Sequence, residues 1–329
     1  MTKSKRVTSA DVARAAGVSR ATVSYILNNT ANQTISVATR TRVLQVAAEL
    51  NYTPLASARI LRRGRSDIVI FLTPNWPIGP TISRLVDALG RDLEPHGLTL
   101  VTRTHLDGSS LTGLWRAITP AAVIRLGSLG SGLDEELRRA AVGVVVEIDD
   151  HEDSSAAVTI PDTRGGRMQV EHLAATGHRT LGYAVPDDAR LREFWEPRLN
   201  GARLACVDLG LDLPVPATVS FDMDVTAVAL TTWREAGVTG VCAYNDEMAM
   251  CILAAARRAG YRLPDDLAVI GFDDIPTAPL VDPPLTTLAI DPDRFAEVVT
   301  SHVLAGLNGV GERLRVDSTS VRLVVRESA

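Results

Sequence analysis

Apolar residues recur with two different periods along the chain, and the period changes near residue 67. Up to that point they lie three or four positions apart, which is the spacing of one face of an α-helix. After it, short β-rich runs alternate with helical stretches, an order typical of α/β folds with parallel sheets. We therefore expect a small all-α head and a larger α/β body that begins at about Asp67.

The head is expected to contain three short helices, each marked by a residue that starts or stops it. Thr8 and Asp11 have the spacing of a capping box at the start of the first helix, and Gly17 ends that helix. Ser19 is expected to cap the second helix and Ser36 the third. Two short helices joined by a glycine turn are typical of a helix-turn-helix, although other small helical bundles share this pattern. The apolar residues expected to face the core of the head are Val12, Ala13, Ala16, Val23, Ile26, Leu27, Val43, Val46, Ala47 and Leu50.

The body has about 260 residues, which is more than one ordinary sheet holds, so we expect two α/β subdomains. A helix is expected over 81–96, between the first two strands. Ligands in such folds bind beyond the carboxyl ends of the strands. The expected strands are 68–73, 99–102, 121–126, 143–148, 180–184, 218–221, 240–243 and 268–271.

The net charge of −5 conceals a charge separation between the head and the body. Residues 1–66 contain 11 Lys and Arg but only two acidic residues, which gives this segment a net charge of +9. The remaining residues therefore carry −14. A basic segment of this size is typical of a protein that binds a polyanion, and the predicted helical order argues against a merely solvated basic tail.

Composition and missing motifs narrow the function classes. With 46% hydrophobic and 22% charged residues the chain is not disordered, and three cysteines without C-x-x-C spacing favour a reduced, cytoplasmic setting. No apolar run approaches the ~18 residues of a membrane span, and the N-terminus has no export signal. The glycine-rich run at 127–132 fits no phosphate-binding pattern and is expected to be a loop. Because no nucleophile–base pair or metal-ligand spacing occurs, we expect no enzyme activity, metal or cofactor.

One segment of the head carries a much more specific pattern. Residues 7–28 read VTSADVARAAGVSRATVSYILN. From Asp11 onward they contain every fixed position of the pattern D-V-A-x-x-A-G-V-S-x-x-T-V-S-x-x-L-N. This run closely resembles the head of the lactose-repressor/galactose-repressor family of bacterial transcription regulators. The resemblance implies a helix-turn-helix DNA-binding domain over 1–52, a hinge helix and linker over 53–66, and an effector-binding and dimerisation domain over 67–329.

The resemblance also assigns DNA contacts to residues of the head. Arg20, Ala21 and Tyr25 match base-reading positions of the recognition helix, where Arg20 can bind a guanine through two hydrogen bonds and Ala21 can touch a thymine methyl group. Capping of helix ends is an alternative role for the hydroxyl residues, and Ser19 and Ser36 are expected to do both. The residues that match positions facing the DNA backbone are Thr8, Ser19, Thr22, Ser24, Asn28, Ser36 and Thr39.

The segment from Pro54 to Gly64 has the residue order of a short helix, which would be marginal alone in water. By itself this segment is better explained as a plain linker. In the family, however, the two hinge helices of a dimer lie in the minor groove, where a leucine wedges between the central base pairs. Leu61 occupies that position, with Ala58 and Arg59 beside it.

The body resembles the effector domain of the same family, a relative of periplasmic sugar-binding proteins. The matching runs are EHLAATGHR at 171–179, NDEMA at 245–249, GFDD at 271–274 and PLTTL at 284–288. The resemblance implies an N-subdomain of about 67–160 plus 290–316 and a C-subdomain of about 163–287 plus 318–329. It also implies three chain crossings between the subdomains and a cleft that closes around a small ligand.

The residues expected to line that cleft are Asn75, Trp76, Arg198, Phe221, Asn245 and Asp273. The fork of Arg198 can hold two sugar hydroxyls or a carboxylate, and Asp273 can accept two hydroxyl bonds. Asn245 ends a predicted strand and offers both a donor and an acceptor. Trp76 can stack on the face of a sugar.

Other roles for these residues remain open at this stage. Asp273 could cap a following helix, and Trp76 could be an ordinary core residue. Arg198 could pair with Glu193 or Glu196 on the surface. The neighbour of Asn245, the aspartate at 246, is expected to cap the helix that starts at residue 247 rather than to bind ligand.

These expectations describe a ligand-responsive transcription regulator, most simply a repressor. It should bind a palindromic double-stranded operator as a homodimer, because one recognition helix reads only a half-site. A sugar or related metabolite in the cleft would change the angle between N-subdomains and withdraw Leu61 from the minor groove, with a coupling of roughly 1–3 kcal/mol. The alternatives are a solute-binding module without DNA reading and an α/β enzyme. No membrane partner is expected.

Overall fold

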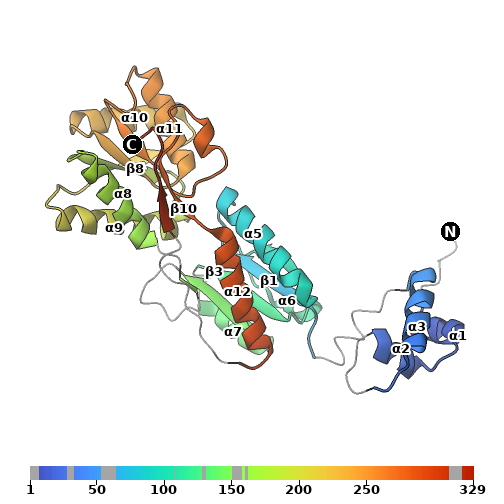
Figure 1. Ribbon diagram of the computed structural model, residues 1–329. Coiled ribbons are helices and arrows are strands. Elements are labelled where there is room, and N and C mark those ends of the chain that lie inside the picture. The colour runs from blue at the N-terminus through green and yellow to red at the C-terminus, as the bar shows by residue number, and fades with distance from the viewer. Residues whose placement is uncertain are drawn as a thin grey trace, which may run out of the picture. The chain divides into compact units, whose positions relative to one another are not determined.

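The computed structural model describes residues 7–27, 33–52, 64–106, 108–127, 131–149, 158–159, 162–310 and 321–329. The chain forms two compact units, the head up to Ser66 and the body from Asp67 to Ala329 (Figure 1). Each unit has its own hydrophobic core.

In the described residues of the head, three short helices surround one small core. The predicted capping box is present, because Thr8 Oγ1 accepts from the Asp11 backbone N–H at 3.4 Å while the Asp11 carboxylate accepts from the Thr8 N–H at 2.9 Å. Gly17 ends the first helix with a left-handed φ of 64°, as its position predicts. The helices are α1 (Ser9–Ala16), α2 (Arg20–Leu27) and α3 (Val37–Glu49). The predicted core is confirmed, with Leu27, Val46 and Leu50 half-buried at its margin.

The first sheet of the body is parallel and has helices on both faces. Its order is β2-β1-β3-β4-β5. Helices α5 and α12 cover one face and pack on Phe71 and Ile124, whereas α6 and α7 cover the other face and pack on Ile70 and Val123. The strands are β1 (Ile68–Thr73), β2 (Thr99–Thr104), β3 (Ala122–Leu126), β4 (Val145–Asp149) and β5 (Val158–Thr159). The helices are α5 (Pro80–Leu93), η1 (Glu94–His96), α6 (Thr112–Ala117), α7 (Ser131–Arg139) and α12 (Pro292–Leu307).

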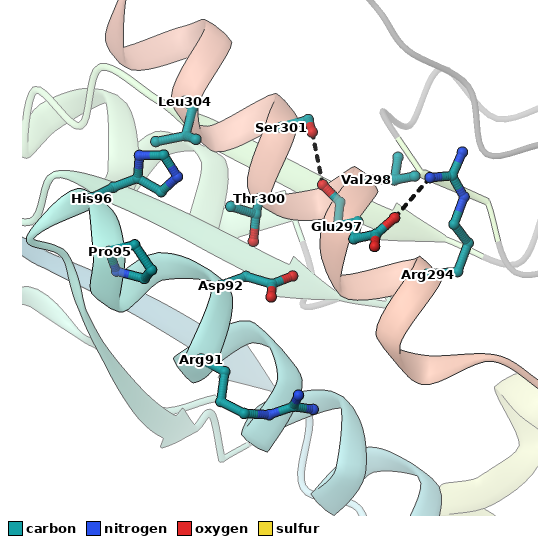
Figure 2. Close-up of a pocket in the computed structure, with 10 residues that line it drawn as sticks. All are labelled: Arg91, Asp92, Pro95, His96, Arg294, Glu297, Val298, Thr300, Ser301 and Leu304. Atoms are coloured by element: carbon teal, nitrogen blue, oxygen red, sulfur yellow. Dashed lines mark hydrogen bonds and ion pairs between the residues drawn. The ribbon is translucent and has the colours of Figure 1, made fainter.

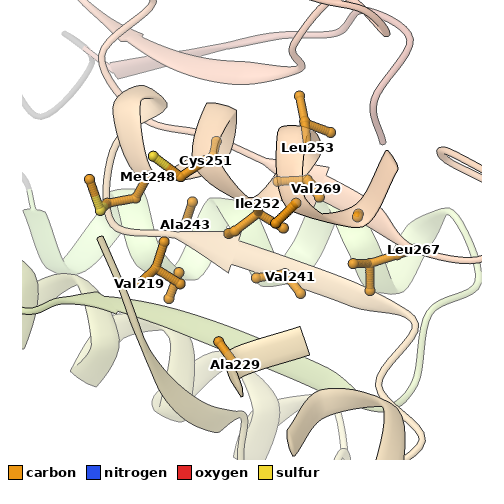
Figure 3. Close-up of a cluster of buried hydrophobic side chains, with 14 of the residues drawn as sticks. Val219, Ala229, Val241, Ala243, Met248, Cys251, Ile252, Leu253, Leu267 and Val269 are labelled. Carbon is orange, nitrogen blue, oxygen red and sulfur yellow. The ribbon is translucent and has the colours of Figure 1, made fainter. Parts of the chain in front are cut away.

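The second sheet is also parallel, in the order β7-β6-β8-β9. One of its faces is covered by α10 and α11, and Figure 3 shows Val241, Val269 and Ile252 of α11 in this core. Helices α8 and α9 cover the opposite face. The elements are α8 (Asp162–Ala175), β6 (Leu181–Pro186), η2 (Ala189–Leu191), α9 (Arg192–Asp208), β7 (Val215–Val219), α10 (Met223–Glu235), β8 (Gly240–Ala243), α11 (Asp246–Arg258), β9 (Ala268–Ile270) and η3 (Ala278–Leu280). An antiparallel pair, β10 (Thr287–Ile290) and β11 (Val321–Val324), completes the body.

Two of the sequence-based elements were placed wrongly. The strand expected over 218–221 is β7, which starts three residues earlier and contains Pro216. Proline argues against a strand in sequence, but β7 lies at the edge of its sheet, where a missing N–H is tolerated. The glycine-rich run at 127–132 is not a loop throughout, since α7 begins at Ser131 and has Asp134 in its first turn.

Close packing of α8 against α9 depends on two glycines. A Cβ on Gly166 would lie 1.7 Å from the Arg198 carbonyl oxygen, and a Cβ on Gly201 would lie 1.8 Å from the Thr163 carbonyl oxygen. Neither position can hold a side chain, because the atoms in the way belong to the facing backbone. This contact brings the start of α8 next to the middle of α9, where the cleft candidate Arg198 lies.

Candidate functional site

The outward side of α2 carries the three predicted base-reading residues. Arg20 and Ala21 are exposed, and Tyr25 is half-buried. Val23 and Ile26 are buried in the head core and fix the orientation of the helix. The structure therefore places the predicted reading residues on one short helix whose opposite side is anchored.

Two of the predicted phosphate-contacting pairs also cap helices. Ser19 Oγ accepts from the Thr22 N–H at 3.1 Å, and the two hydroxyl oxygens lie 2.9 Å apart. Ser36 and Thr39 repeat this arrangement, with distances of 3.2 Å and 2.9 Å. Capping by these serines, predicted from the sequence, is thus confirmed, and each Ser–Thr pair presents two adjacent hydroxyls at a helix start. Ser24 is half-buried on α2.

Four predicted DNA contacts lie outside the residues that the structure describes. They are Asn28, after the recognition helix, and the three hinge residues Ala58, Arg59 and Leu61. Their roles remain predictions.

In the body, Arg198 lies in a buried network rather than on the surface. Its side chain is 6% exposed, and its Nε donates to Asp162 Oδ1 at 2.7 Å. Its Nη1 donates to the Tyr244 carbonyl oxygen at 2.7 Å, and the guanidinium lies 3.6 Å from the centroid of the Phe272 ring. The alternative of a surface pair with Glu193 or Glu196 is therefore wrong. Two of the three guanidinium nitrogens are held by the protein, which leaves Nη2 without a hydrogen-bond partner among the described residues.

Asp273 lies beside this network at the carboxyl end of β9. Its φ of 115° is strained for a non-glycine residue, and it forms an isolated bridge with Ala289. No helix starts directly after it within the described chain, since the next one is η3, so the capping alternative is wrong. Desolvation raises the pKa of the Asp273 carboxyl to about 7, opposed by Arg198 and reinforced by Asp162 and Glu247.

The roles of Asn245 and Asp246 differ from the expectation. Asn245, not Asp246, is the N-cap of α11, because its Oδ1 accepts from the Met248 N–H at 3.0 Å. Asp246 lies inside the helix, fully buried, and its carboxylate accepts from the Ile275 N–H and the Thr287 hydroxyl. An asparagine side chain caps a helix as well as an aspartate does, and the Asp246 side chain instead binds the loop at Ile275 and the Thr287 hydroxyl.

Burial of Asp246 should make the stability of the body depend on pH. Desolvation raises the pKa of this carboxyl from 3.8 to about 8. Between these values the folded state keeps a proton that the unfolded state has released, so stability falls as the pH rises. The slope is at most about 1.4 kcal/mol per pH unit for one proton. We therefore expect the free energy of unfolding, measured with urea, to fall less between about pH 6 and pH 8 in Asp246→Asn than in the unchanged protein.

The exposed residue Asp212 offers a control for this measurement. Asp212→Asn removes one carboxylate from solvent, so its pH slope should match that of the unchanged protein. An equal slope for Asp246→Asn and the unchanged protein would contradict the protonated, buried state of Asp246.

Trp76 links the loop after β1 to the second subdomain. Its ring meets Phe194 of α9 edge-on, with centroids 4.2 Å apart. A Cβ on Gly127 would lie 2.7 Å from the Trp76 ring and 2.9 Å from Glu193 Oε2. A side chain at Gly127 would also be strained by the left-handed φ of 66°. The β3 loop, Trp76 and the start of α9 thus meet at the carboxyl ends of both sheets.

The structure does not bring every cleft candidate into this contact. Asn75 is half-buried next to Trp76. Phe221 lies two residues beyond β7, is 71% exposed and makes no described contact with Arg198. At the start of α5, by contrast, a Cβ on Gly79 would lie 3.9 Å from Glu247 Oε2, so this helix begins beside α11.

Sequence reasoning missed the partners that hold Arg198. Asp162 is fully buried, and Tyr244 and Phe272 are buried beneath the guanidinium. One sequence feature does indicate a close contact near Asp162. Gly165 and Gly166 lie in the same helix, and glycine lowers helix stability, so two glycines there suggest that another backbone packs against them. The pairing across 36 residues still required the fold.

Comparison with known proteins identifies the family of this chain. Residues 8–55 match the family described as bacterial regulatory proteins, lacI family, and residues 170–329 match the periplasmic binding protein-like domain. Over 97% of its length the chain is 30% identical to the HTH-type transcriptional regulator DegA of Bacillus subtilis (strain 168), of which the match covers 96%. The chain belongs to the lacI family of bacterial regulatory proteins.

Solved structures show the same fold as this lacI-family regulator. The Lac repressor dimer bound to operator and the anti-inducer ONPF has a TM-score of 0.82 at 23% identity, covering 98% of this chain and 99% of that one. The CelR–cellobiose complex has a TM-score of 0.68 at 26% identity, covering 98% and 100%. The predicted combination of a helix-turn-helix head with two parallel-sheet subdomains is confirmed. Within the described ranges, no helix is long and apolar enough to cross a membrane.

Proposed function

We propose that this lacI-family regulator is a cytoplasmic repressor that binds a palindromic operator as a homodimer and responds to a small molecule in the cleft of its body. The observation that carries the proposal is the outward side of α2, which presents Arg20 and Ala21 from a capped and anchored helix. The segment that contains α2 has a net charge of +9, which suits a polyanionic duplex. The proposal assigns no catalytic step to the protein.

We assign a separate function to each segment of the chain. We assign DNA reading to residues 1–52, a hinge to 53–66, and effector binding with dimerisation to 67–329. The boundary of the head unit at Ser66 supports this assignment. In the body we assign the N-subdomain to about 67–160 plus 290–316 and the C-subdomain to about 163–287 plus 318–329.

The proposed DNA contacts are of two kinds, those that read base edges and those that position the protein on the DNA backbone. Arg20, Ala21 and Tyr25 read base edges, and Leu61 opens the minor groove with Ala58 and Arg59 beside it. Backbone phosphates are met by the hydroxyl pairs that cap α2 and α3, whose contacts fix the register without specifying sequence. The backbone-contact set is Thr8, Ser19, Thr22, Ser24, Asn28, Ser36 and Thr39.

Two related structures support the assembly and the ligand class. One is titled as a Lac repressor dimer on its operator, and the other as CelR with cellobiose. A homodimer would place two recognition helices on two half-sites. A sugar would fit a cleft whose residues Trp76, Asn245 and Asp273 combine an aromatic face with hydrogen-bonding groups.

The geometry of Arg198 narrows the ligand further. Its Nε–H and one N–H of Nη1 donate to Asp162 and the Tyr244 carbonyl, so the protein fixes the orientation of the guanidinium. We propose that the N–H groups of Nη2 donate to ligand oxygens and that Asp273 accepts from the ligand. A ligand rich in hydroxyl groups can both accept from Arg198 and donate to Asp273, whereas a carboxylate can only accept.

Selection of operators from random duplexes tests the proposal. The full-length protein should enrich a palindrome with a flexible central step. Arg20→Ala should relax preference at one symmetric pair of positions, at a cost of about 1–3 kcal/mol. Leu61→Ala should weaken binding without changing the outer half-site bases.

Arg103→Ala is the matched control for charge, because Arg103 is an exposed arginine on β2 of the body. It should leave both affinity and base preference unchanged. If no sequence is enriched even at low salt, the head does not read DNA, and the body alone would be a solute-binding module.

A further inference from the structure

A cavity of about 630 Å³ lies between α5 and α12, away from the carboxyl ends of the strands (Figure 2). Its size is within the usual range for sites that bind small molecules. It is formed on one side by the end of α5 and η1, and on the other by the middle of α12. The lining residues are Arg91, Asp92, Pro95, His96, Arg294, Glu297, Val298, Thr300, Ser301 and Leu304.

Thr300 gives this cavity a buried polar group. The residue is only 5% exposed, yet its Oγ1 has no hydrogen-bond partner in the described part of the chain. A threonine within a helix usually donates to the carbonyl one turn earlier. Ser301, the next residue, does so and donates to the Glu297 carbonyl at 2.8 Å. The Thr300 hydroxyl is therefore a buried polar group in the wall of the cavity that has no partner among the described residues, in contrast to its neighbour.

The charges of the lining leave one carboxylate uncompensated. Arg91 is paired with Asp293 at 2.6 Å, and Arg294 with Glu297 at 2.7 Å. Asp92 is half-buried on α5 and has no ion-pair or hydrogen-bond partner among the residues that the structure describes. In Figure 2 its carboxylate lies in the space between the two helices, across from Thr300. Both arginines are engaged, so the cavity favours a cation over an anion.

The remaining wall is apolar. Pro95, Val298 and Leu304 line the cavity beside Asp92 and Thr300. A few polar groups set in an apolar wall are typical of sites that orient a small organic ligand.

We propose that the cavity between α5 and α12 is a second small-molecule site, separate from the cleft, that takes an organic ammonium ion with a short apolar body. The ammonium group donates to the Asp92 carboxylate and to Thr300 Oγ1, and the apolar body covers Pro95, Val298 and Leu304. The site depends on neither DNA binding nor the ligand of the cleft, so its test is independent of the proposed repressor function.

Three probes of the same shape test the ligand class on the full-length protein. They are phenethylamine, 2-phenylethanol and phenylacetate, which differ in charge but share one apolar ring. Saturation-transfer NMR titrations should show saturable binding of phenethylamine, with a roughly millimolar dissociation constant for so small a ligand. The alcohol should bind roughly tenfold more weakly, and the acid should not bind, because only the amine forms a charge-assisted bond to Asp92.

Substitutions of lining residues test whether phenethylamine binds in the cavity between α5 and α12. Asp92→Asn keeps the shape of the side chain and should weaken phenethylamine roughly tenfold. Thr300→Val removes the hydroxyl and should also weaken it. Asp87→Asn is the matched control, since Asp87 is an exposed aspartate on the same helix and does not line the cavity, and it should leave binding unchanged.

The proposal is overturned if phenethylamine fails to saturate, if the alcohol or the acid binds as well, or if Asp92→Asn and Asp87→Asn bind it equally. Thermal unfolding of each variant shows whether it is folded. If Asp92→Asn does not fold, the binding of phenethylamine to Thr300→Val tests the proposal instead. This substitution introduces no polar group and keeps the volume of the side chain.

Discussion

Gly166→Ala should destabilise the body by about 3 kcal/mol or more, the upper range for overpacking. The added Cβ would lie 1.7 Å from the Arg198 carbonyl oxygen and 3.0 Å from the Ala202 nitrogen. Both atoms belong to the backbone of α9, so no side-chain rotation relieves the clash and α8 must move away from α9. Urea or thermal unfolding of the full-length protein should show the loss as an earlier transition of the body.

The effect should not be general to helix glycines. Gly90 lies inside α5, and a Cβ placed there would meet nothing within 4 Å in the described structure. Gly90→Ala should therefore be neutral or stabilising by up to about 1 kcal/mol, because alanine has the higher helix propensity. Similar transitions for Gly166→Ala and Gly90→Ala would show that α8 and α9 are not in the close contact described.

This helix contact bears on function because it positions Arg198. Separation of α8 from α9 would part Asp162 from Arg198, whose Nε–Oδ1 distance is 2.7 Å. The guanidinium would then lose the orientation that Asp162 and the Tyr244 carbonyl give it. The glycines thus act on the proposed ligand through backbone packing, without any contact to it.

The head could be predicted almost completely from its sequence, because its structure rests on local interactions. The capping box at Thr8, the left-handed Gly17 and the cap at Ser19 each involve residues within a few positions of one another. Helical periodicity then selected the buried residues, from Val12 to Ala47. The contacts of this head with DNA remain predictions, and those of the hinge lie outside the described residues.

The cleft could be predicted only in part, because its interactions join distant segments. Arg198 and Asp273 are predicted from the resemblance and Trp76 from its place after the first strand, but the burial of Arg198 on Asp162 and over Phe272 depends on the arrangement of α8, α9 and β9. A sequence pattern also cannot rank two adjacent cap candidates. The helix at 246–258 starts at an asparagine cap because the following aspartate has a buried role with the loop at Ile275.

Asp162→Asn should cost about 3–5 kcal/mol, the range found when one partner of a buried ion pair is removed. The substitution keeps the size of the side chain but leaves the Arg198 charge without its carboxylate in a site where the two side chains are 0% and 6% exposed. Asp208→Asn provides a matched control. The Arg167–Asp208 pair also joins α8 to α9 at 2.7 Å, but its side chains are 35% and 60% exposed. Its loss should cost less than about 1 kcal/mol, because solvent screens the pair.

A double substitution separates stability from function. Asp162→Leu combined with Arg198→Leu removes both buried charges, and its stability should approach that of the unchanged protein far more closely than Asp162→Asn does. Chemical unfolding of the single and double variants measures this difference. Equal losses for Asp162→Asn and Asp208→Asn would contradict the burial of the first pair. Recovery in the double variant would mean that the fold does not require the ion pair.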